Sequence, residues 1–416
     1  MKVQARSVAG AMLQWLAVAA ALLMLGGAGC QSTGPTVIGN ELPFDQAVAQ
    51  ATDGLVAQTQ KLPAFLAKVE AQVDAKVNRK VVLIDPMIDA ASGQQTGVTR
   101  LVEQKVTERL AQHQQMELVP FQGANLARAQ YLLIGTTVRS AAGGASSGAR
   151  RPFQINLALV DLAARTVLAQ ASAVARDDGL DTSPTAYYQD SPVLLKDAVV
   201  EGYIRTAQTP PGQAADRFYL DRLAASALVN DGNSAYNANR YQDALGLYRN
   251  ALSTPAGEQL RALNGVYLAS WRLGRTAEAE QAFGRIVAFG LQQHNLGVKF
   301  LFNPGSTEFW SDPKVSGPYS IWLRQIARQA AAAKVCMNVV GHTSHTGSEQ
   351  VNDRLSQARA TAIKQKLEAD AAELGPRTKA SGVGWRENII GTGTDDVTDA
   401  LDRRVEFKIV PCGASA

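Results

Sequence analysis

The chain has 416 residues, of which 46% are apolar and 19% charged, and its formal net charge is +4. This length allows two to four domains, and the composition is that of an ordinary globular protein. Residues 1–29 contain Lys2 and Arg6 but no acids, so the rest of the chain has 39 basic against 37 acidic residues, or +2. Such a small net charge gives no indication of a nucleic-acid partner.

The amino terminus has the pattern of a signal peptide: a basic start, an apolar run over residues 16–25 and a small-residue stretch that ends at Cys30. Small residues directly before a cysteine resemble the lipobox of bacterial lipoproteins, which implies that Cys30 is lipidated and becomes the first mature residue. Gly27 stands where Leu is usual, and the alternatives are ordinary secretory cleavage or an uncleaved anchor. Gln31 looks like the outer-membrane choice in lipoprotein sorting, which implies a lipid-anchored protein facing the periplasm.

The next unit is predicted to be an α/β domain. The apolar run 81–84 stops at Asp85-Pro86 and is typical of a buried strand. Further elements are expected as a helix around residues 98–110, strands at 116–121 and 131–138, and a hairpin of strands at 153–159 and 166–175. This order, with Leu159-Val160-Asp161-Leu162 before the last turn, resembles the lipoprotein domains that activate penicillin-binding proteins or belong to the curli-secretion group. The alternative is a generic α/β sandwich with no shared role.

A helical region with an internal repeat follows. Ala244 and Tyr248 recur as Ala279 and Phe283, both at an offset of 35 residues. This spacing resembles tetratricopeptide repeats, in which paired helices approach through a small alanine and an aromatic side chain. Because two repeats are few for a free-standing array, we expect these helices to pack on an adjacent domain. They would serve as a groove for a protein partner or as a rigid spacer.

The most specific pattern lies near the carboxyl terminus. Apolar residues from Val335 to Val340 predict a strand that Gly341 ends, and a polar turn then opens into a helix. On that helix Arg359 falls about 40° from Leu355, within the apolar stripe. An arginine in this position either forms an intramolecular ion pair or binds a carboxylate or phosphate.

Four ordered motifs over residues 297–412 resemble the OmpA-like peptidoglycan-binding domain. They are Phe300-Leu301-Phe302-Asn303, then Gly341-His342-Thr343 with Gly347, Asn352, Leu355-Ser356 and Arg359-Ala360, then Gly382-Val383-Gly384, and finally Asp402-Arg403-Arg404-Val405-Glu406. The resemblance implies a βαβαββ domain that grips the stem peptide of the cell wall without a covalent bond. The implied contact residues are Arg359, Ser344, Thr343, Asn352, Asp402 and Arg403.

The principal departure from that family is Ser344, which stands where the family has its ligand-binding aspartate. The resemblance gives Arg359 the ligand's carboxylate, whereas Ser344 offers hydrogen bonds without a charge. Asp402, where the family often has Asn, is expected to return a carboxylate nearby.

Cys336 and Cys412 form an even pair, which in an oxidising periplasm predicts a disulfide, with two free thiols as the alternative. We expect no metal site, because His342 and His345 lack further zinc ligands. No orienting acid or GxSxG elbow accompanies Ser344, so neither catalysis nor a cofactor is expected.

Taken together, the sequence predicts a multidomain α/β plus α protein. Its expected parts are a lipoprotein-type signal peptide (1–29), a tether with helices (30–78), an α/β sandwich domain (79–180), a connecting segment (181–213), tetratricopeptide-like helical hairpins (214–293) and the OmpA-like domain (297–412). The expected function is that of an outer-membrane lipoprotein that binds peptidoglycan, tethers the envelope and presents its helices to an envelope protein. The alternative is a periplasmic adaptor, an envelope-assembly factor or a regulator of wall synthesis whose OmpA-like domain no longer binds peptidoglycan.

Overall fold

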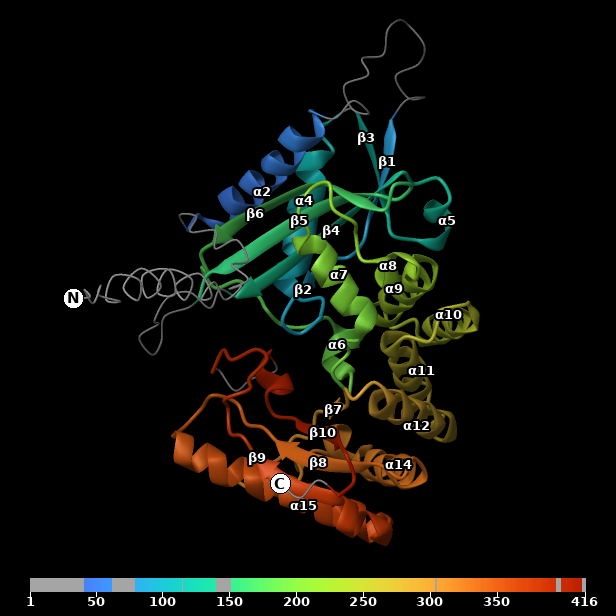
Figure 1. Cartoon of the computed structure of the whole chain (residues 1–416), viewed down its shortest axis with the longest axis vertical. Helices are drawn as coiled ribbons and strands as arrows, with labels where there is room; N and C mark the ends of the chain where they lie inside the picture. The colour runs from blue at the N-terminus through green and yellow to red at the C-terminus, as the bar shows by residue number, and fades with distance from the viewer. Residues whose placement is uncertain are drawn as a thin grey trace, which may run out of the picture. The chain divides into compact units, whose positions relative to one another are not determined.

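The computed structural model describes residues 41–61, 79–113, 115–139, 151–303, 305–393 and 398–413 (Figure 1). Residues 41–416 form one compact unit, and the predicted signal peptide and Cys30 lie outside the described residues. Among the described helices, none is both long and apolar enough to cross a membrane. The described residues form two mixed β-sheets and a set of helices.

The first sheet has the strand order β3-β1-β4-β5-β6, with β2 beside β4. Its strands are β1 (Lys80–Ile84), β2 (Ile88–Asp89), β3 (Met116–Pro120), β4 (Tyr131–Arg139), β5 (Phe153–Asp161) and β6 (Thr166–Ala175). Strand β1 pairs in parallel with both β3 and β4, whereas β4, β5 and β6 are antiparallel. After β1 the chain therefore adds β3 on one side of β1, and it then adds β4, β5 and β6 on the other side. This arrangement confirms the strands expected from residue 81 to residue 175.

Helices cover both faces of this sheet (Figure 1). Alternate residues of β1 point to opposite faces: Val82 belongs to a core with α2 (Phe44–Thr59) and α4 (Gly97–Leu110). Leu83 belongs to a second core with α7 (Ala198–Gln208). The short α5 (Gly123–Leu126) precedes β4.

The segment expected to connect two domains contains α6 (Ala186–Asp190) and α7. Asp197 caps α7 by accepting hydrogen bonds from the amides of Val199 and Val200, at 3.0 and 3.1 Å. Its second carboxylate oxygen accepts from the amide of Leu260 at 2.9 Å, which ties α7 to the helix that begins there. This segment is therefore a packed layer between the sheet and the helices that follow.

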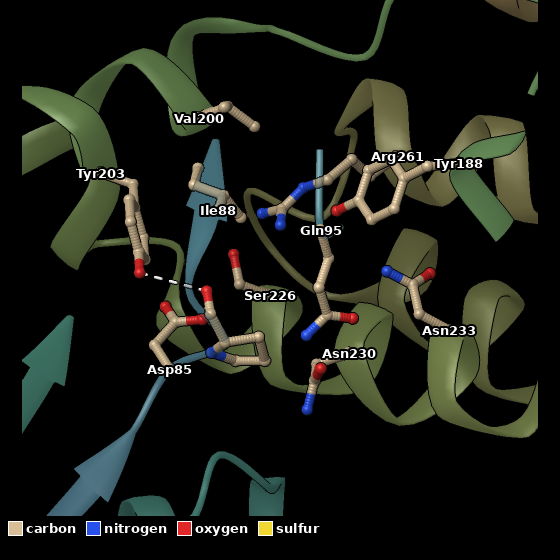
Figure 2. Close-up of a pocket in the computed structure, with 11 residues that line it drawn as sticks. Asp85, Ile88, Gln95, Tyr188, Val200, Tyr203, Ser226, Asn230, Asn233 and Arg261 are labelled. Atoms are coloured by element: carbon tan, nitrogen blue, oxygen red, sulfur yellow. Dashed lines mark hydrogen bonds between the residues drawn. The ribbon is translucent and has the colours of Figure 1, made fainter. Parts of the chain in front are cut away.

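A buried carboxyl group lies directly after β1, where Figure 2 shows Asp85 close to Tyr203. The Tyr219 hydroxyl donates a hydrogen bond to Asp85, and the Tyr203 hydroxyl donates to the carbonyl oxygen of Pro86 at 3.1 Å. Burial raises the pKa of Asp85 to about 7, although the bond from Tyr219 opposes the shift. The folded protein thus holds a proton on Asp85 that the unfolded chain releases near pH 4.

The helical region consists of α8 (Arg217–Leu220), α9 (Leu223–Asn237), α10 (Tyr241–Ser253), α11 (Leu260–Arg272) and α12 (Thr276–Gln292). Tyr248 fills the space between these helices, because a Cβ on Gly232 or Gly265 would lie within 2.5 Å of its ring. The helices continue into the next core, where Phe283 stacks on Trp322. The assignment of these hairpins as tetratricopeptide repeats stays a prediction.

The second sheet has the order β7-β10-β8-β9. Its elements are β7 (Gly297–Val298), α13 (Pro313–Ser316), α14 (Tyr319–Ala332), β8 (Cys336–Gly341), α15 (Glu349–Asp370), η1 (Ala372–Arg377), β9 (Thr378–Gly382), η2 (Thr398–Leu401) and β10 (Val405–Val410). Apart from the short helices, this order is the expected βαβαββ. The position of the opening strand was wrong: β7 precedes the expected Phe300–Asn303, and Phe302 forms only an isolated bridge to Phe309. Phe300 and Phe302 are instead buried in the core.

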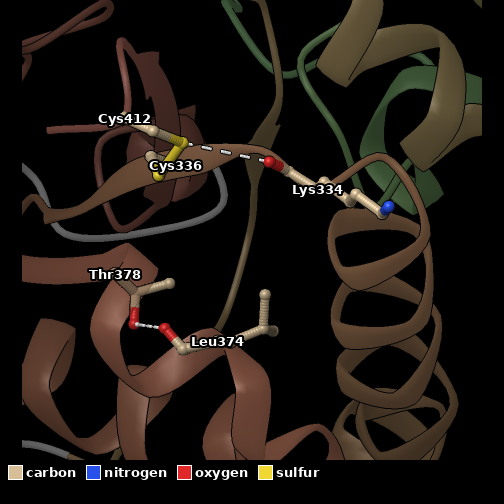
Figure 3. The surroundings of a disulfide bond; sticks show 5 residues. All are labelled: Lys334, Cys336, Leu374, Thr378 and Cys412. Carbon is tan, nitrogen blue, oxygen red and sulfur yellow. Dashed lines mark hydrogen bonds between the residues drawn. A yellow bond between two sulfur atoms is a disulfide. The ribbon is translucent and has the colours of Figure 1, made fainter.

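A disulfide joins Cys336 to Cys412, as Figure 3 shows. It links the first residue of β8 to the segment that follows β10. Strands β8 and β10 also pair with each other along their length. The predicted disulfide is thereby confirmed.

We predict that Asp85→Asn reduces the loss of stability that the wild type undergoes as the pH rises from about 4 to about 7. Because the pKa of Asp85 is raised in the folded state, its stabilising contribution is complete below about pH 4 and is lost as the pH rises through about 7. The loss has an upper bound of about 4 kcal/mol for this shift. Urea unfolding of both proteins at pH 5 and pH 8 measures it, with the exposed Asp243→Asn as control. A wild type that loses no stability relative to Asp85→Asn between these pH values contradicts the prediction.

Candidate functional site

Helix α15 lies unusually close to the ends of β8 and β9 because a glycine ends each strand. A Cβ on Gly341 would lie 2.2 Å from the carbonyl oxygen of Ser356, and one on Gly382 would lie 2.2 Å from the amide nitrogen of Gln357. Gln357 also covers the edge of β9, since its side-chain amide bonds to the backbone of Gly382 and Ala380. The two strand ends and the helix therefore form one rigid support.

Two turns meet above this support. The turn after β8 joins the turn after β9 through the amide of Thr343, which donates to the carbonyl oxygen of Gly384 at 2.9 Å. The amide of Gly384 in turn donates to the Ser356 hydroxyl at 2.9 Å. The side chain of Asn352 donates to the carbonyl oxygen of Thr346 at 2.7 Å. Asn352 thus fixes the shape of the first turn from within the helix.

Arg359 is buried, with 6% of its surface exposed. Its Nε donates to the carbonyl oxygen of Ser306 at 3.2 Å, and one terminal nitrogen donates to that of Asn303 at 3.4 Å. Its guanidinium also lies 4.7 Å from the centre of the Phe302 ring. These neutral groups orient the guanidinium, so the arginine expected in the apolar stripe is held in a defined position.

Thr343 and Ser344 are both buried in the turn after β8. The hydroxyls of Ser344 and Thr346 lie 3.4 Å apart. Within the described part of the chain, the Thr343 hydroxyl has no hydrogen-bond partner. Since a buried hydroxyl normally finds a partner, Thr343 has hydrogen-bonding capacity that a ligand could use.

Asp402 directs its carboxylate at a neighbouring loop. Its buried carboxylate accepts hydrogen bonds from the amides of Ile389, Ile390 and Gly391 at 2.7, 3.0 and 2.8 Å. Burial raises the pKa of Asp402, and these three amides oppose the shift. The carboxylate is thus directed at the 389–391 loop and shapes it. Arg403 beside it is half-buried.

Sequence reasoning missed an ion-pair network on β10. Arg404 contacts Glu406 at 2.6 Å, and Lys408 lies 3.0 Å from Glu387 and 3.5 Å from Glu406. Burial opposes ionisation of Glu406, yet His342 and Arg404 hold the pKa of its carboxyl well below its usual range. The alternation of Arg404, Glu406 and Lys408 along one strand was the available signal, because residues two apart share a face.

The same network contains a group that could be considered for a metal. Ligand atoms of His342, Glu387 and Glu406 all lie within 4.8 Å of one another. However, the cationic side chains of Arg404 and Lys408 already pair with the two carboxylates. A divalent ion would have to displace both cations, so the cluster fits an ion-pair network better than a metal site.

Comparison with known proteins identifies the domain that carries this site. The sequence profile of the OmpA family matches residues 301–400, so the chain contains an OmpA family domain there. This range includes Arg359, Ser344, Thr343 and Asn352 but ends before Asp402 and Arg403. No curated protein matches the chain.

Several solved structures are similar to a part of this chain. The peptidoglycan-associated lipoprotein from Burkholderia pseudomallei is 22% identical over 27% of this chain and 89% of its own, with a TM-score of 0.23. The cell wall anchor of the T6SS from Pseudomonas aeruginosa is 25% identical over 27% of this chain and 78% of its own, with a TM-score of 0.23. The periplasmic domain of Helicobacter pylori MotB is 19% identical over 28% of this chain and 74% of its own, also with a TM-score of 0.23.

We predict that Gly382→Ala destabilises the protein by about 1–3 kcal/mol, because the added methyl group has no room against α15. Gly246→Ala is the matched control: nothing lies within 4 Å of its Cβ position in α10, so it should be neutral or up to ~1 kcal/mol more stable. Urea unfolding of both variants measures the difference. Equal stabilities would show that α15 is not held against β9 as described.

Proposed function

We propose that the OmpA family domain binds peptidoglycan without a covalent bond and that Arg359 meets a carboxylate of the stem peptide. The observation that supports this proposal is the OmpA family match over residues 301–400, a range that includes the buried Arg359. The motif resemblance gives this arginine the ligand's carboxylate. The proposal involves recognition only, and we assign no catalytic step to the site.

The energetics favour a carboxylate at Arg359. The guanidinium is already desolvated, and Asn303, Ser306 and Phe302 hold it in one orientation. A ligand therefore meets a donor whose orientation is already fixed, which lowers the entropic cost of binding. A hydrogen bond to a charged partner contributes roughly 1.5–3 kcal/mol in such a setting.

Ser344 sets the limit on affinity. The related domains have an aspartate at this position, which would attract the amine side of the stem peptide, whereas a serine only donates and accepts hydrogen bonds. Thr343 supplies a second hydroxyl beside it. We therefore propose that this site binds the wall more weakly than an aspartate-bearing site, or prefers a different stem peptide.

We further propose that the protein is an outer-membrane lipoprotein, anchored through Cys30 and facing the periplasm. The polar stretch after Cys30 gives the folded unit slack from the membrane. Residues 214–293 would present a surface to an envelope protein. The domain boundaries predicted from the sequence are part of this proposal. An anchor at one end and a wall-binding domain at the other would tether the membrane to the wall.

The second candidate function is that of an adaptor or envelope-assembly factor that has lost wall affinity. The presence of Ser344 in place of the aspartate favours it, because one of two charged contacts is then missing. In that case the OmpA family domain would serve as a scaffold. Recovery of one envelope protein in crosslinked complexes, without any binding to the wall, would support this function.

Co-sedimentation with purified peptidoglycan sacculi tests the wall-binding proposal. We predict that Arg359→Ala lowers retention at least tenfold, because the loss of a charge-assisted pair of about 1.4 kcal/mol or more gives such a factor. Arg354→Ala is the control, since Arg354 lies on the same helix but is exposed. Equal retention of the wild type and Arg359→Ala, or no retention of either, would refute Arg359-dependent binding.

A second variant tests the role of Ser344. We predict that Ser344→Asp raises retention on sacculi several-fold, because it restores the carboxylate that the family uses. The gain should disappear when Arg359→Ala is combined with it, since both residues would hold the same ligand. Unchanged or lower retention of a folded Ser344→Asp protein would show that this position does not set affinity.

A further inference from the structure

A small cavity lies at the carboxyl end of β1, far in sequence from the OmpA family domain. Figure 2 shows its lining, to which α9 contributes Ser226 and Asn233, and α11 contributes Arg261. Asp85 lies at its base, directly after β1. Since β1 pairs with β3 on one side and β4 on the other, this is the point where ligands collect in α/β sheets.

Arg261 carries a positive charge into this cavity. Its Nε atom is buried and has no hydrogen-bond partner among the described residues. Over the same residues, no carboxylate oxygen lies within 4.0 Å of its guanidinium, and the contact to Gln259 is 3.5 Å long. An arginine stays ionised inside a protein, so a buried Nε–H that has no partner among the described residues has lost its hydration, and an anion in the cavity could restore the missing hydrogen bond.

Acids lie near this charge, but within the described residues none forms a direct ion pair with it: burial lowers the pKa of Arg261, whereas the charges of Tyr188, Asp197 and Asp85 raise it. Asp197 directs its carboxylate at three backbone amides, those of Val199, Val200 and Leu260. Asp85 accepts the hydrogen bond from Tyr219 and is largely protonated below about pH 7, because burial raises its pKa. Arg261 also lies in the first turn of α11, whose positive end adds to the local potential.

The size of the cavity restricts what can enter. The space open to the centre of a water-sized sphere is about 20 Å³. One water needs roughly 10–15 Å³ by this measure, so the cavity holds one or two small particles and excludes sugars, nucleotides and amino acids. Asn233 adds a polar group: its carbonyl oxygen accepts from the Tyr248 hydroxyl, so its NH2 group is available to the cavity.

We propose that this cavity is a binding site for a small monovalent anion of the size of chloride. The anion accepts hydrogen bonds from the Arg261 guanidinium and joins the end of β1 to α9 and α11. This site is independent of the proposed wall-binding site, because its residues precede the OmpA family domain in the chain. Its occupation stabilises the packing of the first sheet against the helical region, since a ligand that binds only the folded state stabilises that state.

Thermal unfolding of the full chain in chloride against gluconate, at constant ionic strength and pH 6, tests the site. Gluconate is too large for the cavity, so the unfolding midpoint should rise by roughly 2–4 °C as chloride replaces it. Arg261→Met should lose this rise, whereas Arg285→Met, a change of an exposed arginine on the next helix, should keep it. Equal midpoints in the two salts would overturn the proposal, as would a full chloride effect in Arg261→Met.

Diffraction from wild-type crystals soaked in bromide supplies a test that does not depend on a variant folding. An anomalous peak beside the Arg261 guanidinium supports the proposal. A water molecule alone in the cavity, with no bromide signal, overturns it.

Discussion

The close contact between α15 and the ends of β8 and β9 is the constraint on which the carboxyl-terminal site depends. Gly341 and Gly382 permit it, because any side chain there would collide with the helix backbone. The Ser356 hydroxyl then binds the turn after β9 through Gly384, and that turn binds Thr343. The position of Thr343 next to the helix thus depends on the two glycines, because neither has a side chain. The site is built on helices and strands, and its turns are held at both ends.

Three buried arginines show how the same charge is accommodated in different ways. Arg404 pairs directly with Glu406, which makes it a structural element of β10. Arg359 contacts two carbonyl oxygens and an aromatic ring, which orient the guanidinium. Arg261 has a long contact to Gln259, lies near Tyr188, Asp197 and Asp85, and lines a small cavity in which its Nε has no partner among the described residues. The three side chains thus differ in the groups that hold them, although each has lost most of its hydration.

Local patterns in the sequence predicted most of the strands of the first sheet, because strand alternation and turn residues are encoded within a few residues. The βαβαββ order of the second sheet was instead implied by the resemblance to the OmpA-like domain. Local patterns failed where the partner lies far along the chain. Residues 181–213 were expected to be a connecting segment because they are rich in Asp, Ser, Pro and Gln, and this composition gives no sign that α7 packs on the first sheet. Likewise, motif position placed Asp402 near the ligand, whereas its carboxylate folds back onto the 389–391 loop.

The placement of Asp402 bears on the function of the domain. Asp402 was the residue expected to compensate for the missing aspartate at position 344, but its oxygens are occupied by backbone amides and burial raises its pKa. A ligand amine would have to compete with three amides for that carboxylate, at the cost of the loop it shapes. The turn therefore offers hydroxyls from Thr343 and Ser344, and the helix offers the buried guanidinium of Arg359. In the proposed wall-binding role, the Arg359 guanidinium would contribute most of the affinity for a carboxylate, and the hydroxyls would orient the ligand.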